Sequence, residues 1–151
     1  MLENQEILNR NGYFPENNLK NLPELCCFWQ KVLRLQDWDV KAAIVRYHEL
    51  KDGCFFGYTS WELAKKFAEI KILDYQDYHL RHWWDRDQEI TLVHELIHLH
   101  MAPFKGDWKE DSLESAAFEH AIGCFSTALV MLKRVGKIDE KSPWPLALPG
   151  R

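Results

Sequence analysis

Three histidines and a glutamate lie inside an apolar stretch of the chain, ITLVHELIHLHMAPF at residues 90–104. His94, Glu95 and His98 spell the motif HExxH. On an α-helix, side chains four residues apart lie one above the other on the same face, so the two imidazoles can hold one Zn²⁺ ion. Glu95 is rotated by about a quarter turn from His94 and can reach past the ligands to a water molecule on the ion. The motif therefore predicts two zinc ligands and a general base on one turn of helix.

The apolar residues around the motif indicate that this helix is buried on most sides. Three polar groups in such surroundings each need a partner, and a metal ion satisfies two of them at once. A buried polar cluster with only a packing role is the alternative. His100 points about 200° away from His98, so we expect it near helix-end carbonyl groups instead of at the metal.

A catalytic zinc usually has three protein ligands, and Glu114, Glu119 and His120 are the downstream candidates. The two glutamates are five residues apart and face directions about 140° apart, so they cannot both serve. Glu114 lies at the start of the last predicted helix, where it can bond backward to a free backbone N–H. It also shares a face with Phe118 and Ile122, which keeps it as the alternative third ligand. Glu119 lies in mid-helix beside small residues, which suggests that something fits against it.

Hydrophobic periodicity and turn residues predict the elements that position these side chains. Strands and helices are segregated along the chain, so the expected class is α+β, with one small sheet covered by helices. The alternation in KFAEIKILDY suits a half-buried strand with an exposed or edge position. Asp85 or Asp87 is the expected N-cap of the HExxH helix, Pro103 its end, and Asp111 the N-cap of the last helix. The predicted elements are a helix over 23–36, strands over 38–48, 54–60 and 67–73, and helices over 87–101 and 112–134.

Length and composition suit one domain of a soluble globular protein, with 151 residues, 46% hydrophobic and 28% charged. We divide the chain into an N-terminal arm at 1–22, a domain at 23–136 and an extended tail at 137–151. The net charge of −4 has no basic block, which argues against a nucleic-acid partner. The N-terminus does not read as a signal peptide, and the uncharged run 121–132 is too short to span a bilayer. We therefore expect a cytoplasmic protein with no membrane partner and with its four cysteines reduced.

HELIH at 94–98, followed after a loop by SAAFEHAIGCFSTALV at 115–130, resembles the gluzincin branch of zincin metallopeptidases. The chain's size and its HELIHLHMAPF segment resemble the small minigluzincin proteins of phages and some prokaryotes. The resemblance covers residues 90–132. It implies a zincin-like domain in which a short, mostly antiparallel sheet packs against the HExxH helix and a following glutamate-bearing helix. It also implies His94, His98 and Glu119 as zinc ligands, with the strand at 67–73 as the edge of the substrate cleft.

The chain departs from this family at Gly123, where many gluzincins carry an acidic residue oriented toward a ligand histidine. The hydrogen bonds that orient the ligands must come from elsewhere or are weaker, and weaker ones would reduce catalytic strength more than metal binding.

The function that these features predict is zinc-dependent hydrolysis of peptide bonds in a peptide or protein substrate, with Glu95 as general base. Tyr78, His79 and His82 are the nearest sequence candidates for a donor to the oxyanion of the transition state. The main alternative is a zinc-binding, zincin-like protein without peptidase activity that acts as a regulator or partner-binding protein. A helical interaction module without metal is the third. The apolar tail segment PWPLALPG is a candidate for a peptide mimic that blocks the cleft.

Overall fold

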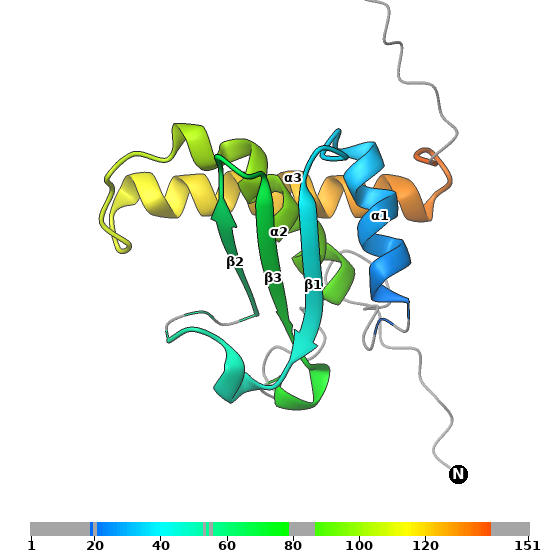
Figure 1. Cartoon of the computed structure of the whole chain (residues 1–151), viewed down its shortest axis with the longest axis horizontal. Helices are drawn as coiled ribbons and strands as arrows, with labels where there is room; N and C mark the ends of the chain where they lie inside the picture. The colour runs from blue at the N-terminus through cyan, green and yellow to red at the C-terminus, as the bar shows by residue number, and fades with distance from the viewer. Residues whose placement is uncertain (1–18, 20, 53, 55, 79–86, 140–151) are drawn as a thin grey trace, which may run out of the picture.

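The computed structural model describes residues 19, 21–52, 54, 56–78 and 87–139. Residues 1–18 of the predicted arm, residues 140–151 of the predicted tail, and the candidate residues His79, His82 and Asp85 lie outside this part of the chain. Within it, three α-helices and a three-stranded sheet form the layers seen in Figure 1.

The sheet consists of β1 (Asp39–Val45), β2 (Gly57–Glu62) and β3 (Phe67–Leu73) in the order β1-β3-β2. β3 pairs parallel with β1 and antiparallel with β2. The α+β class is confirmed, whereas a mostly antiparallel sheet is wrong, because the two pairings are of opposite kinds. The short 3₁₀ helix η1 (Tyr47–Glu49) lies in the connection from β1 to β2.

β3 lies at the centre of the sheet, so its predicted edge position is wrong. The bounds of β3 are those predicted, 67–73, and its residues Ala68, Ile70 and Ile72 are buried as the alternation predicts. Alternation reports which face of a strand is covered, and it does not report how many strands flank it. The edge strand that lies against the HExxH helix is β2.

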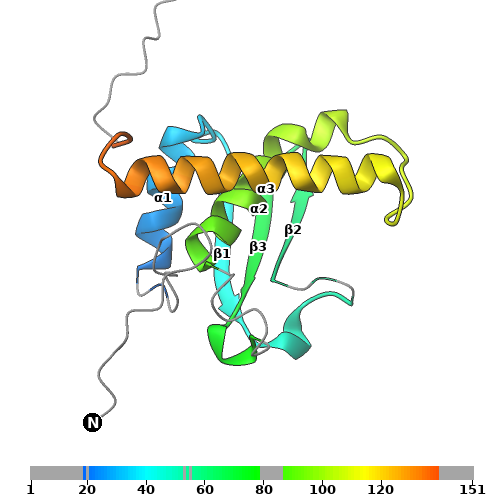
Figure 2. The same cartoon turned by 180° about the vertical axis from the view of Figure 1, so that it is seen from behind.

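The HExxH helix α2 (Gln88–Met101) lies between the sheet and the long helix α3 (Leu113–Arg134). Figure 1 shows the sheet in front of α2, and Figure 2, from behind, shows α3 in front of it. α1 (Leu22–Val32) packs at one side of these layers. The core gathers between them from the sheet and all three helices, with Trp29, Ile70, Leu92, Leu96 and Ile122 almost fully buried.

The helix ends follow local chemistry. Asp87 caps α2 by accepting hydrogen bonds from the backbone N–H groups of Glu89 and Ile90, as predicted for one of two aspartates. α3 is capped by Ser112, which accepts from the N–H of Ser115, so the expected Asp111 cap is wrong. α1 ends earlier than predicted because Arg34 adopts a positive φ of 61°. Pro103 follows α2 inside the 3₁₀ helix η3 (Ala102–Phe104).

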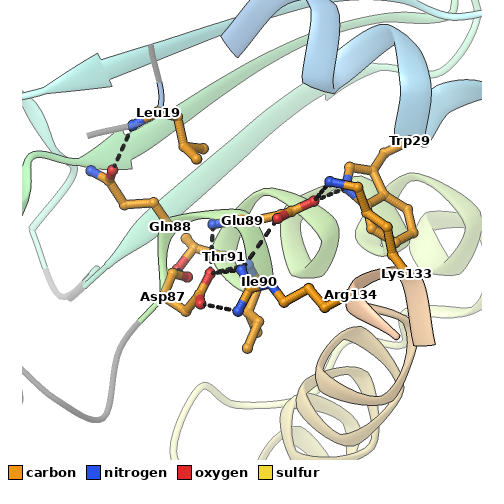
Figure 3. A network of polar contacts seen from close by, with 9 residues as sticks. All are labelled: Leu19, Trp29, Asp87, Gln88, Glu89, Ile90, Thr91, Lys133 and Arg134. Carbon is orange, nitrogen blue, oxygen red and sulfur yellow. Dashed lines mark hydrogen bonds and ion pairs between the residues drawn. The ribbon is translucent and has the colours of Figure 1, made fainter. Parts of the chain in front are cut away.

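A buried network of charges joins the N-terminus of α2 to the C-terminus of α3 (Figure 3). Arg134 donates to both oxygens of Asp87, at 2.7 and 3.0 Å, and reaches Glu89 Oε2 at 3.2 Å. Glu89 Oε1 accepts from Lys133 Nζ at 2.5 Å and from Trp29 Nε1 of α1 at 2.9 Å. Acids at the start of one helix and bases at the end of the other also suit both helix dipoles. The network therefore fixes the register of α3 along α2.

We predict that Glu89→Gln lowers the free energy of unfolding by about 3 kcal/mol, because Lys133 and Arg134 lose the charge of a side chain that is only 2% exposed. Chemical denaturation measures this change. Glu114→Gln, on the exposed start of α3, is the matched control and should change stability little. Equal stability of wild type and Glu89→Gln would contradict the assignment.

Candidate metal centre

The structure brings His94 and His98 of α2 together with Glu119 of α3. One ligand atom from each residue lies within 4.8 Å of the other two. His94 Nε2 is 3.0 Å from Glu119 Oε2 and 3.2 Å from His98 Nε2, and His98 Nε2 is 3.4 Å from Glu119 Oε1. Side chains from two successive turns of α2 and from one turn of α3 thus converge on one place.

These distances suit a tetrahedral ion. Ligand atoms about 2.0–2.1 Å from zinc in a tetrahedron lie roughly 3.3–3.4 Å from one another. The two imidazole nitrogens are 3.2 Å apart, and each lies 3.0 or 3.4 Å from a different oxygen of Glu119, which is close to this value. Two imidazole nitrogens 3.2 Å apart can share at most one proton, whereas one cation can bind both of them with the carboxylate. The donor set of two histidines and one glutamate is one that catalytic zinc takes. The residues therefore fit Zn²⁺.

The charge and exposure of the group are also suitable for a cation site. Hydrogen bonding by His94 and then by His98 holds the pKa of Glu119 well below its usual range, so this carboxylate is ionised. The side chains of His94 and His98 are 23% and 12% exposed, and that of Glu119 is 48% exposed. The site is thus open to solvent on the α3 side, which leaves access for a further ligand.

Glu114, the alternative third ligand, is exposed at the start of α3 and is not part of this group. His120 points away and lies 3.5 Å from Cys124 Sγ on the same helix. His100, as expected, is at a carbonyl group, since its Nε2 contacts the backbone oxygen of Leu33 at the end of α1.

Glu95 lies on the sheet side of α2 and is 7% exposed. The hydroxyl of Thr59 on β2 donates to Glu95 Oε2 at 2.5 Å and also lies 3.3 Å from the backbone oxygen of Glu95. Burial raises the pKa of Glu95, while the Thr59 hydrogen bond and the nearby His94 and His98 lower it, and the net shift is upward. The second oxygen, Oε1, accepts no hydrogen bond from any residue that the structure describes.

Gly57 on β2 makes room for this carboxylate. A Cβ atom at Gly57 would lie 2.7 Å from Thr91 Cγ2 and 2.8 Å from Glu95 Oε1, both closer than real contacts allow. Sequence reasoning missed Gly57 and Thr59, because nothing in the sequence indicates that β2 crosses α2 at this point. β2 is therefore the strand that sets the position of the predicted base.

Aromatic rings flank the group on its other side. The ring of Phe118 lies 5.9 Å from that of His98, and Trp108 packs on Phe118 at 5.5 Å. Sequence reasoning also missed Trp108, which precedes α3 in a loop. These rings give the side of the site toward the start of α3 an apolar wall.

Tyr78, one of the three predicted oxyanion donors, is 7% exposed and packs edge to face on Phe56 in a small cluster with Val45, Leu50 and Leu73. None of the contacts that the structure gives for it is with the His94, His98 and Glu119 group. Gly123 faces open space, since a Cβ atom there would meet nothing within 4 Å. The ligand atoms of His94 and His98 are their Nε2 atoms, and over the described ranges no hydrogen bond reaches the other ring nitrogen, Nδ1, of either residue. Gly123 has no side chain that could accept a hydrogen bond from a ligand histidine. Within this part of the chain, no other residue takes that role.

Searches of protein-family models, of curated proteins and of solved structures gave no match to this chain. The likeness to gluzincins consequently stays a prediction from the motif and its spacing.

We predict that His94→Ala, His98→Ala and Glu119→Ala each weaken zinc binding by more than about 100-fold, more than the loss of an outer hydrogen-bond partner usually costs. Competition with a chromogenic chelator measures the affinity. Glu114→Ala is the matched control and should bind zinc like the wild type. A loss of affinity in Glu114→Ala with none in Glu119→Ala would reverse the choice of third ligand.

We predict that Gly57→Ala displaces the Glu95 carboxylate, because the added methyl group needs the space of Oε1. A crystal structure of the variant measures the displacement, and zinc affinity should stay unchanged because no ligand moves. Gly123→Ala adds the same methyl group in open space and is the control. A Glu95 side chain that keeps its wild-type position in Gly57→Ala would be inconsistent with the close packing of β2 on α2.

Proposed function

We propose that this protein is a zinc-dependent metallopeptidase with a zincin-like domain, in which His94, His98 and Glu119 hold the ion. The observation that carries the proposal is the convergence of three ligand atoms from two helices within 4.8 Å, with Glu95 in the next position on the same helix turn. The two-histidine, one-glutamate donor set leaves a coordination position for water or substrate. The cofactor is accordingly Zn²⁺.

The residues of the chain have separable roles in peptide hydrolysis. When bound, zinc would lower the pKa of a water molecule and polarise the substrate carbonyl group. Glu95 accepts the proton of the attacking water and passes it to the leaving amine. Thr59 holds Oε2 of Glu95, so Oε1 is the oxygen that is free to take the proton. Burial raises the pKa of Glu95. A carboxylate with a raised pKa holds the accepted proton more firmly, so Glu95 can keep it until it passes to the leaving amine.

The position of β2 supports an extended peptide as substrate. β2 pairs with β3 on one side only, and within the described residues its other side has no strand partner. This free edge belongs to the strand that contacts Glu95 through Thr59. Peptides in an extended conformation add to such edges by main-chain hydrogen bonds. β2 takes the role that we predicted for 67–73.

A zinc-binding regulator or partner-binding protein without peptidase activity is the second candidate. The observation that favours it is the open space at Gly123, together with the lack of a described partner for the outer histidine nitrogens. Ligands without such partners bind and orient a catalytic metal less well. A helical module without metal, a cytoplasmic location and the lack of nucleic-acid or membrane partners stay predictions.

We predict that Glu95→Gln retains zinc and lowers the rate of casein or peptide cleavage by about 10²–10⁴-fold, the usual contribution of a general base. Metal analysis and a fluorogenic peptide assay, run on the same sample, measure the two quantities. Glu114→Gln, an exposed glutamate outside the group, is the matched control and should cleave like the wild type.

Zinc-loaded wild type that is as inactive as Glu95→Gln over a varied peptide library would contradict the peptidase proposal. The same result would favour the regulator, because the metal would be present without hydrolysis.

A further inference from the structure

α3 presents a second apolar face, directed away from α2. We call the exposed residues Ala121, Cys124, Phe125, Ala128, Leu132 and Val135 the outer face of α3. Phe125 is 62% exposed and Val135 55%. The sequence from His120 to Leu132 contains no charged Lys, Arg, Asp or Glu. Solvated helix faces in soluble proteins are usually polar, so this one needs another explanation.

The opposite face of α3 is already used. Ile122, Ser126 and Val130 are buried, and Lys133 and Arg134 are bound to Glu89 and Asp87. Figure 2 shows α3 across the front of the molecule, with none of the other described elements over its outer face. α3 is also long and apolar enough to cross a membrane by length and composition, and 17% of its most apolar window is buried. Burying the outer face therefore needs a surface beyond the described fold.

The spacing of the outer face fits another helix. Ala121, Phe125, Ala128, Leu132 and Val135 follow one another at intervals of four, three, four and three residues. This is the spacing of a coiled-coil seam, where each large side chain packs between residues of a facing helix. Small residues at 121 and 128 allow close approach beside the larger ones. A bilayer sets no such spacing.

Charges favour a second copy of the chain over a membrane surface. Helices that lie on membranes present Lys and Arg to anionic lipid headgroups, whereas the basic residues of α3 are held inside the domain by Glu89 and Asp87. The acidic start of α3, with Glu110, Asp111 and Glu114, would lie near the end of a partner helix in an antiparallel pair. That end is followed by Lys137, and antiparallel helices also align their dipoles favourably.

Symmetry then places the axis of the pair. In a twofold dimer each copy uses the same patch. The outer face and Leu113, which is 86% exposed, extend from 113 to 135 with their midpoint at Cys124. Antiparallel pairing about this point sets Ala121 level with the partner's Thr127, one residue before the partner's Ala128. Cys124 of one copy then lies opposite Cys124 of the other copy across the twofold axis.

We propose that the protein forms a symmetric homodimer by antiparallel packing of the outer faces of two α3 helices. The contact is about 33 Å long, at 1.5 Å per residue, and about 10–12 Å wide. Such a strip is at the lower end of specific interfaces, so we expect a dissociation constant on the order of tens of micromolar. The dimer does not depend on the metal centre. His94 and His98 belong to α2, and Glu119 lies on the side of α3 that faces them.

Sedimentation equilibrium of the full chain, at concentrations on either side of that dissociation constant, tests the dimer. The wild type should change from monomer to dimer mass, and Phe125→Glu should weaken association by at least tenfold. Tyr47→Glu is the matched control, because Tyr47 is 63% exposed on η1, at the other end of the molecule from α3, and it should dimerise like the wild type. Far-UV circular dichroism checks that each variant is folded.

A wild type that stays monomeric at every concentration overturns the proposal, as does a dimer that persists in Phe125→Glu. Monomeric wild type that co-sediments with phosphatidylcholine vesicles also overturns it, in favour of a membrane surface.

Disulfide trapping tests the antiparallel geometry. With copper-phenanthroline as oxidant, two Cys124 thiols at the axis should form one Sγ–Sγ bond, with two protons and two electrons lost to the oxidant. The covalent dimer should disappear in Cys124→Ser and remain in Cys27→Ser, since Cys27 is the exposed cysteine of α1. A covalent dimer that requires Cys27 instead would overturn this arrangement.

Discussion

Three buried carboxylates on α2 must each have a partner, and the arrangement of the domain depends on this requirement. Asp87, Glu89 and Glu95 are 3%, 1% and 7% exposed. An ionised carboxylate without compensation in such surroundings costs several kcal/mol. Asp87 and Glu89 find cations on α3, and Glu95 finds a hydroxyl group on β2. α2 is therefore tied by its acids to the layers on both of its sides.

The candidate metal centre follows from these ties. The ionic network holds the end of α3 against the start of α2, and the two helices run antiparallel from there. Glu119 of α3 contacts His94 and His98 of α2, although 20 residues separate it from His98 in the sequence. Thr59 meanwhile keeps Glu95 on the sheet side of the helix. The two histidine ligands and the base thus occupy neighbouring positions on α2, the histidines in contact with Glu119 of α3 and the base in contact with Thr59 of β2.

The sequence was most informative where local chemistry decides the outcome. The HExxH helix, Asp87 as one of two candidate caps, and the bounds of β3 could be predicted from periodicity, capping preferences and a motif. The residues alone left Glu114 and Glu119 as rival partners of the two histidines, and the resemblance to gluzincins implied Glu119. The central position of β3, its parallel pairing with β1 and the contact of Thr59 with Glu95 could not. Those depend on how distant segments pack, and alternation in a strand carries no information about its neighbours.

The same limit applies to the ends of α3. Asp111 and Ser112 are both good capping residues, and only the path of the preceding loop decides between them. Lys133 and Arg134 read as ordinary C-terminal residues that favour the helix dipole. Their bonds to buried acids more than 40 residues away appear only in the folded chain.

X-ray absorption spectroscopy of the zinc-loaded protein tests the central claim most directly, because it reports the atoms around the ion. We predict two imidazole nitrogens at about 2.0–2.1 Å, with oxygen from a carboxylate and water completing the shell. The oxygen contribution should change in Glu119→Ala. Sulfur ligands at about 2.3 Å, or a spectrum without imidazole scattering, would contradict a site built from His94, His98 and Glu119.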